Sequence, residues 1–387
     1  MGGEYDLQRI HIKELKRFLD HFFKLDDAVK SLSDHRKKYK IPLSHIFYSL
    51  FYTSILSKNS FLNKDKLLRK KYMKNFIGSD RKMVASDSTL NRNLSHNIIT
   101  NELKQINING YNAYKDEHFT DSFLNRKCAI LDGSYAGGFM KEVLFVPGKT
   151  DYILNFNAIP KRGKELVSAE RLLLDTNKIV GKGYFDLVLG DGLYYSKNIF
   201  RLVREKTGSH VLIKTSERLN VVKDVEGIIT EMPTQVNNVT GYDYERGLKY
   251  NINALKDVKA DTIDYPLQVA IVEEINRKDK KETFYVITSD LSLSPEELRY
   301  AAHLRWRIEN NGFKELNNLY NTKRKYSKNE TCFTNLFWII IFAYNIFHLF
   351  LNHVDLKMII LKGKSVLKDW IDLLFESVIE GYSFDSS

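Results

Sequence analysis

The sequence predicts an α/β protein in which a mixed sheet is flanked by helices, preceded by a helical N-terminal domain and interrupted by a β-rich insertion. Three observations support this fold class. Residues 1–125 carry apolar side chains at helical spacing. From residue 126 onward, short apolar runs typical of strands alternate with helical segments, which is the pattern of a mixed α/β sheet. Residues 217–264 are polar, with several glycines and few apolar runs, so we interpret them as the insertion.

The size and charge of the chain limit the classes of protein it can belong to. Its 387 residues, 43% of them hydrophobic, suffice for two or three domains with a large buried core. Lys and Arg outnumber Asp and Glu by 59 to 48, and this surplus suits a polyanionic partner, although a merely soluble basic protein would share it. Two isolated cysteines argue against a disulfide-built secreted protein, and the charged N-terminus does not resemble a signal peptide. We therefore expect a cytoplasmic protein.

The N-terminal region is predicted to contain amphipathic helices, because its apolar residues recur every three or four positions. These positions are Leu7, Ile10, Leu15, Phe18, Leu19 and Phe22 in a first helix, and Ile46, Phe47, Leu50, Phe51 and Ile55 in a second helix after Pro42. Residues 86–94 (SDSTLNRNL) are typical of a helix start, with Ser88 or Thr89 as the expected cap.

A basic segment follows the second helix. Eight cationic residues lie in it, namely Lys64, Lys66, Arg69, Lys70, Lys71, Lys74, Arg81 and Lys82. Phe61, Tyr72 and Phe76 are interleaved with them. Such a mixture suits a DNA-facing surface, and it equally suits a solvated basic helix.

Residues 126–216 and 265–354 are predicted to form the two parts of the sheet domain, and 355–387 a C-terminal helical tail. The predicted strands are 127–133, 142–148, 151–160, 184–192, 210–216, 266–275 and 281–290, and the predicted helices are 164–180, 194–206 and one that opens at Ser294. Two of these strands end in Asp-Gly, at Asp132 and Asp191. Open α/β sheets place their active sites at the C-terminal ends of strands, so both aspartates are candidate site residues.

The helix that opens at Ser294 has a strong start signal. Ser294, Pro295 and Glu297 form a capping box with proline at the first helical position. Arg305 and Glu309 are four residues apart and share a helix face. The other residues on that face are Ala302, Gly312, Phe313 and Leu316, and they are mostly apolar. A carboxylate there is costly unless it is paired or binds a cation, so Glu309 is either an ion-pair partner of Arg305 or a metal ligand.

The three acids together suggest a particular chemistry. A single Asp-Gly after a strand is a common turn. Asp132, Asp191 and Glu309 in combination could hold two metal ions ~3.5–4 Å apart, the arrangement that activates a nucleophile and stabilises the leaving oxygen in phosphoryl transfer on DNA. Hard carboxylate oxygens favour Mg²⁺, for which Mn²⁺ can substitute. The chain contains no HExxH, GxSxG or GxxxxGK[ST] sequence, so other catalytic chemistries have little support.

One apolar segment, residues 332–352, is long enough to span a bilayer. It contains Asn335, Asn345 and His348, each of which is costly in lipid. We therefore predict a buried core helix of a soluble domain and no membrane association.

Several of these motifs occur together in a known family. The segments FYVITSDLSLSPEEL and LRWRIENNGFKEL within residues 284–316, with their RWxIE core, and the shorter motifs AILDG and LGDGLYYS resemble the DDE transposases of bacterial insertion sequences. The similarity is greatest to the group with a Tyr-Arg-Glu-Lys signature, and it extends over residues 42–344. The resemblance implies an RNase H-like core with the insertion between the second Asp and the Glu. It also implies cut-and-paste transposition by a homodimer on paired transposon ends.

The resemblance also implies roles for individual residues. Asp132, Asp191 and Glu309 fall on the catalytic and metal-binding triad, and Arg305 on the arginine that contacts the terminal-strand phosphate. The signature Tyr would fall on Ala302, with Tyr300 the nearest tyrosine. The signature Lys would fall on Leu316, with Lys314 nearby, or on Asn317 if one residue is inserted after the Glu. The candidate DNA phosphate-binding residues are therefore Arg305, Lys314 and Tyr300.

These observations predict a transposase that cleaves double-stranded DNA at terminal inverted repeats and joins it to target DNA, bound through residues 1–125 and associated with the nucleoid. Two alternatives are a related RNase H-like nuclease without joining activity and a non-catalytic DNA-binding derivative of a transposase. The presence of all three acids speaks against the second alternative.

Overall fold

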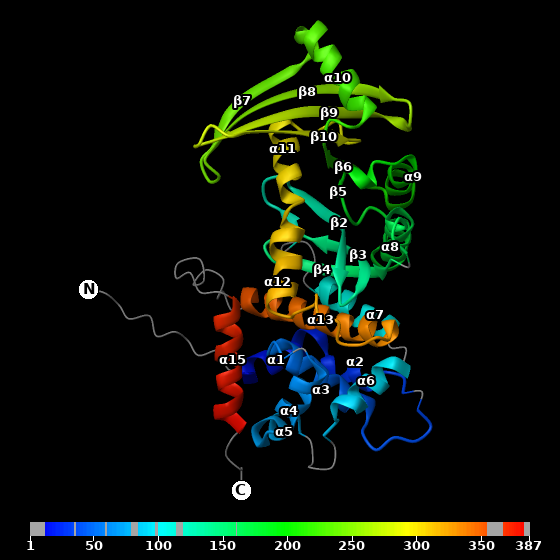
Figure 1. Cartoon of the computed structure of the whole chain (residues 1–387), viewed down its shortest axis with the longest axis vertical. Helices are drawn as coiled ribbons and strands as arrows, with labels where there is room; N and C mark the ends of the chain where they lie inside the picture. Colours follow the sequence, from blue (N-terminus) through cyan, green and yellow to red (C-terminus); the bar gives the residue numbers. More distant parts are fainter. Residues whose placement is uncertain are drawn as a thin grey trace, which may run out of the picture. The chain divides into compact units, whose positions relative to one another are not determined.

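A computed structural model describes residues 12–34, 36–58, 60–78, 84–96, 100–113, 119–159, 161–353 and 367–382 (Figure 1). The chain divides into two compact units. Unit 1 comprises Met1–Lys115, Tyr135–Phe139 and Lys314–Ser387. Unit 2 comprises Asp116–Ser134 and Met140–Phe313.

Unit 2 contains a mixed sheet, which within the described residues has ten strands in the order β4-β3-β2-β5-β6-β10-β9-β8-β7, with β1 paired to β2. The strands are β1 (Thr120–Asp121), β2 (Arg126–Ala136), β3 (Phe139–Val146), β4 (Tyr152–Ala158), β5 (Leu187–Asp191), β6 (His210–Thr215), β7 (Asn237–Asp243), β8 (Leu248–Ala260), β9 (Ile263–Asn276) and β10 (Lys281–Thr288). β2, β5 and β6 are parallel, whereas β10 pairs antiparallel with β6. Each predicted strand is therefore present.

Helices flank this sheet. They are α8 (Glu165–Val180), α9 (Lys197–Arg201), which continues into the π-helix η2 (Leu202–Thr207), α10 (Asn220–Glu231) and α11 (Pro295–Leu304). In Figure 1, α8 and α9 lie on one side of the central strands and α11 on the other. The predicted fold class, an RNase H-like mixed sheet flanked by helices, is confirmed.

The central strands are apolar because both of their faces are covered, as is usual for parallel strands. Cys128, Ala129, Ile130 and Leu131 of β2 and Leu187, Val188 and Leu189 of β5 are all buried. The two aspartates follow these apolar runs. The apolar packing therefore determines where each acid emerges from the core.

The insertion is richer in helix than predicted. Strands β7 and β8 extend the same sheet beyond β9, as expected for a β-rich insertion. The helix α10 was not predicted, because its segment looked polar as a whole. Its apolar residues Val221, Val222 and Val225 are buried, which explains why this segment folds as an amphipathic helix.

Unit 1 is built from helices. They are α1 (Ile12–Phe23), α2 (Leu25–Lys30), α3 (Leu43–Ile55), α4 (Phe61–Leu68), α5 (Lys71–Ile77), α6 (Asp87–His96), α7 (Thr100–Ala113), α12 (Lys314–Asn318), α13 (Glu330–His353) and α15 (Leu367–Tyr382). Helix α13 packs against α3, α6 and α7. Residues 314–353, which we expected in the sheet domain, therefore group with the N-terminal helices.

Helix α13 is the core of unit 1. Among the described residues it is the helix long and apolar enough to cross a membrane, but 94% of its most apolar window is buried within the protein. Its amides are satisfied internally: Asn345 Nδ2 donates to Asn107 Oδ1 at 2.8 Å, and Asn335 Nδ2 donates to the Leu94 carbonyl at 2.8 Å. The prediction of a buried core helix is confirmed.

The first and sixth helices begin at other residues than the sequence predicts. Leu7 and Ile10 lie outside the described residues, and α1 begins at Ile12. The expected cap at Ser88 or Thr89 was wrong, because α6 already begins at Asp87. Ser86 is the capping residue, since the Thr89 N–H donates to its Oγ at 3.3 Å.

The basic segment is partly core. Lys64 is fully buried, and its ammonium donates to the Leu50 carbonyl, Thr53 Oγ1 and Ser54 Oγ at 2.8–3.3 Å. Phe61 and Phe76 are buried as well. A DNA-facing role is therefore wrong for these three residues. The exposed cations of the segment are Lys66, Arg69, Lys70 and Lys71, while Arg81 and Lys82 lie outside the described residues.

Candidate active site

The two aspartates lie level with each other on adjacent parallel strands. In the β2–β5 register Ile130 is opposite Leu189, so Asp132 and Asp191 each follow two residues later on the same face. Asp191 ends β5, as predicted. Asp132 does not end its strand: β2 continues to Ala136 in its hairpin with β3. The expectation that this strand ends at Asp132-Gly133 was wrong, because the pairing with β3 keeps the chain extended to Ala136.

Asp191 is held by the turn that follows it. Its Oδ1 accepts the Leu193 N–H at 2.9 Å and caps the short 3₁₀-helix η1 (Gly192–Tyr194). The ring of Tyr194 folds back against the strand, where a Cβ at Gly190 would lie 2.8 Å from Tyr194 Cδ2. A glycine at position 190 therefore leaves the space that this ring occupies.

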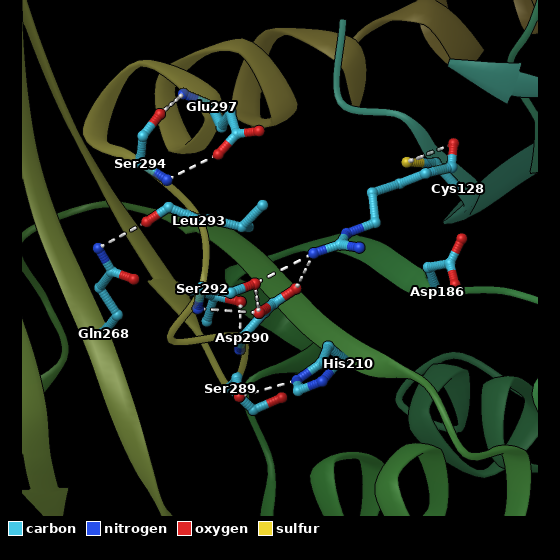
Figure 2. Close-up of polar contacts among 12 residues, drawn as sticks. Cys128, Asp186, His210, Gln268, Ser289, Asp290, Ser292, Leu293, Ser294 and Glu297 are labelled. Atoms are coloured by element: carbon cyan, nitrogen blue, oxygen red, sulfur yellow. Dashed lines mark hydrogen bonds and ion pairs between the residues drawn. The ribbon is translucent and has the colours of Figure 1, made fainter. Parts of the chain in front are cut away.

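The start of helix α11 is fixed by a polar cluster (Figure 2). The Ser294 N–H donates to Glu297 Oε2 at 2.7 Å and the Glu297 N–H donates to Ser294 Oγ at 3.2 Å, so the predicted capping box is confirmed. Just before it, Gln268 of β9 donates its Nε2 to the Leu293 carbonyl at 3.2 Å. These contacts fix where the helix that leads to Arg305 begins.

A second buried contact holds the middle of α11 to the insertion. Arg299 Nε lies 2.6 Å from Glu274 Oε1, and its Nη2 lies 3.0 Å from Asp243 Oδ2. His303 Nε2 is 2.7 Å from the same Glu274 oxygen. Strand β7 of the insertion and strand β9 of the sheet domain thus position the helix immediately before Arg305.

The helix is not regular where it carries the third acid. Helix α11 ends at Leu304, and a π-helix, η4 (Ile308–Phe313), follows. Ala302, Gly312 and Leu316 are buried, but Glu309 is exposed. Our expectation that Glu309 shares an apolar face with them was wrong, because the interruption and the wider π-helical turn change the helical phase. π-helical turns occur often at functional sites.

Arg305 contacts both Asp132 and Glu309. Its Nη2 lies 2.8 Å from Glu309 Oε1, which is the ion pair considered from the sequence. Its Nη1 also lies 3.5 Å from Asp132 Oδ2. The guanidinium is nearly buried, and its Nε has no partner among the described residues.

Charge interactions couple all three acids. Burial is the largest cause that raises the pKa of Asp132, to about 7. The Arg305 guanidinium opposes this rise, whereas the negative charges of Asp191 and Glu309 add to it. Asp132, Asp191 and Glu309 therefore belong to one electrostatic site.

Two neighbours of this site were missed from the sequence. Lys214 of β6 is level with Asp191 of β5, and its ammonium lies 4.0 Å from the Phe284 ring centroid and 4.7 Å from that of Trp306. Trp306 is 43% exposed. The available signals were a lysine inside an apolar strand and a tryptophan inside the RWxIE motif.

A buried pair lies beside the Asp191 turn and was also missed. Tyr194 donates its hydroxyl to Glu142 Oε1 of β3 at 2.6 Å, and both side chains are buried. Burial, together with the charges of Asp132 and Asp191, raises the pKa of Glu142 to about 8, against the effect of the Tyr194 hydrogen bond. The sequence signal was a glutamate at the start of the apolar run EVLFV.

The structure does not bring Tyr300 to the acids. Its hydroxyl donates to Asp121 Oδ2 at 2.9 Å, and its ring packs on Phe123. Ala302 and Leu316, the positions of the signature Tyr and Lys, are buried and apolar. Lys314 is exposed at the start of α12, in unit 1.

The donor set fits a hard divalent cation, because its ligands are carboxylate oxygens whose mutual repulsion a cation would relieve. In the part of the chain that is described, however, no three His, Cys, Asp or Glu side chains are already grouped closely enough to hold an ion. The acids are coupled without forming a closed metal site.

The mixed sheet flanked by helices, with two level aspartates on adjacent strands and an Arg–Glu pair after α11, is an RNase H-like fold with a cluster of acidic residues. Residues 132–346 match the family described as a transposase DDE domain. Because the match covers more than half of the chain and includes Asp132, Asp191 and Glu309, the chain belongs to this family. No curated protein matches it. The protein is therefore a DDE transposase, and its substrate is DNA.

Proposed function

We propose that this transposase cuts double-stranded DNA at the terminal inverted repeats of an insertion sequence and joins the freed ends to target DNA, by a cut-and-paste route. The observation that supports this most directly is the coupling of Asp132 to both Asp191 and Glu309, with Arg305 in contact with the first and third acids. Such a site suits repeated phosphoryl transfer on one DNA end.

Each residue would have a separate part in the reaction. Asp132, Asp191 and Glu309 would hold two Mg²⁺ ions, or Mn²⁺ in their place. When bound, these ions activate the attacking water or 3′-hydroxyl and stabilise the leaving oxygen. Arg305 would hold a phosphate of the terminal strand through its planar fork of N–H donors.

We also propose a transposase group and an oligomeric state for this protein. The RWxIE motif supports membership of the bacterial group with the Tyr-Arg-Glu-Lys signature, with Ala302 and Leu316 as departures from it. Other residues of this chain would have to make the phosphate contacts of the signature Tyr and Lys, and Lys314 is a candidate. A homodimer on paired ends, in the nucleoid, would complete the assembly.

A strand-transfer assay tests the function. The full-length protein is incubated with labelled duplexes that carry the element's terminal repeats, a supercoiled target plasmid and Mg²⁺. We expect cleavage at the repeat boundary and covalent joining of the labelled ends to the plasmid. Cleavage without joining would replace this proposal with a nuclease that does not transpose.

A further inference from the structure

The hydrogen bond between Glu142 and Tyr194 lies inside unit 2 and joins β3 to the turn that follows β5. The bond is 2.6 Å long, and both side chains are almost completely buried. The second carboxyl oxygen of Glu142, Oε2, is buried with no hydrogen-bond partner among the described residues. Burying a carboxyl group with one oxygen unpaired costs free energy, so its presence here calls for a functional reason.

The Glu142–Tyr194 hydrogen bond connects the segments next to Asp191 and Asp132. Tyr194 is the last residue of the 3₁₀-helix that Asp191 caps. Glu142 lies on β3, the direct neighbour of β2, which carries Asp132. One buried hydrogen bond therefore ties the turn after the second acid to the strand beside the first acid.

The local packing restricts the conformation of the turn Gly192–Tyr194. The Tyr194 ring occupies the space above Gly190, one residue before Asp191. The Asp191 Oδ1 atom is already used by the Leu193 N–H. The direction of the remaining oxygen, Oδ2, therefore depends on how firmly Gly192–Tyr194 is held.

We propose that Glu142 and Tyr194 are positioning residues for Asp191, which hold its turn so that Oδ2 is directed to a divalent cation. Neither residue touches the ion or the DNA. The inference rests on the proposed metal-dependent function. This positioning role differs from that of a fourth metal ligand, because Glu142 has only to accept a hydrogen bond from the Tyr194 hydroxyl.

Two conservative variants separate these roles. Tyr194→Phe removes the hydroxyl and keeps the ring. Glu142→Gln keeps an oxygen that accepts the same hydrogen bond and removes the acid. Tyr195→Phe is the matched control, because it removes the hydroxyl of the adjacent tyrosine, which interacts with Thr262 instead.

Mn²⁺ binding to the DNA-free full-length protein is measured by titration calorimetry, and circular dichroism checks the fold. Loss of a group that orients a metal ligand typically weakens binding about 10-fold or more, and we expect this for Tyr194→Phe. Glu142→Gln and Tyr195→Phe should bind Mn²⁺ as the wild type does. If Tyr194→Phe does not fold, Glu142→Met provides the same test, because it keeps the volume and lacks the acceptor.

Unchanged Mn²⁺ affinity in Tyr194→Phe or Glu142→Met would overturn the positioning role. Loss of binding in Glu142→Gln as complete as in Asp132→Asn would overturn it too, and would make Glu142 a direct ligand. If wild-type protein and Asp132→Asn bind Mn²⁺ equally, the proposed metal site itself fails, which is a separate result.

Discussion

The two parts of the active site are built in different ways. Asp132 and Asp191 lie on adjacent parallel strands, where register and buried apolar neighbours fix their positions. Glu309 lies in a π-helical turn after an interrupted helix. The side chain of Asp132 is 15% exposed and that of Glu309 is 48% exposed, and Arg305 contacts both. The sheet therefore supplies the buried part of this acidic cluster, and the π-helix supplies the exposed part.

The largest effect should come from removing any one of the acids. Asp132→Asn, Asp191→Asn and Glu309→Gln keep side-chain shape but lose the charge that holds the cations, so each should abolish strand cleavage and leave end binding largely intact. Mg²⁺ or Mn²⁺ should be required, and Ca²⁺ should support binding only, because cleavage demands tight octahedral geometry. Gel assays of cleavage and binding on the same DNA measure both properties.

Two outcomes would contradict a site made of both sheet and helix acids. Robust cleavage by Glu309→Gln in Mg²⁺ would remove the helical part from the catalytic site and leave the sheet acids alone. Cleavage in excess chelator would exclude the two-metal mechanism altogether.

A smaller effect is expected from replacing Arg305, which contacts both Asp132 of the sheet and Glu309 of the π-helix. Arg305→Lys keeps the charge but loses the fork that can bind a phosphate bidentately. Removing one preorganised donor from a catalytic site costs about 100-fold in rate, and we expect a loss of this order in cleavage. Arg307→Lys is the matched control, because Arg307 donates to the Gly148 carbonyl and pairs with Asp151 instead.

Thermal unfolding distinguishes the two explanations for Arg305. If Arg305→Lys loses stability in proportion to activity, the ion pair with Glu309 is structural. A large loss of single-turnover cleavage with an unchanged melting temperature supports the phosphate contact.

The contrast between buried and exposed positions also applies to the basic segment of unit 1. Lys66 and Lys70 are exposed, whereas Lys64 is buried. If the exposed lysines neutralise DNA phosphates, Lys66→Ala combined with Lys70→Ala should reduce the slope of log affinity against log salt by about 2. Lys64→Met should leave that slope unchanged. Equal slopes in all three proteins would remove this segment from the DNA interface.

The sheet could be predicted because its strands are continuous apolar runs, and the aspartates because they follow two of those runs. The π-helix could not be predicted, because the capping box at Ser294 specifies where the helix begins and says nothing of where its phase changes. The pairing of Glu142 with Tyr194 depends on strand order, which the sequence did not provide. Lys64 looked like a DNA contact because a charge run does not show which lysine points inward.

Stability without metal tests the contrast between Asp132 and Glu309 directly. The pKa of Asp132 is raised from 3.8 to about 7 in the folded protein, so the folded state binds this proton more tightly than the unfolded state. The free energy of unfolding should therefore fall as the pH rises from about 4 to about 7. This rise in pKa corresponds to at most roughly 4 kcal/mol.

Asp132→Asn lacks this titration, so between pH 4 and pH 8 the metal-free variant should lose less stability than the wild type, by about 1–4 kcal/mol. Glu309→Gln should keep most of the wild-type pH dependence, because it removes only one contribution to the Asp132 pKa and leaves the larger effect of burial. Urea unfolding at several pH values in chelator measures both variants. Identical pH dependence in Asp132→Asn and wild type would mean that Asp132 ionises normally in the fold, and the electrostatic coupling that unites the three acids would then be wrong.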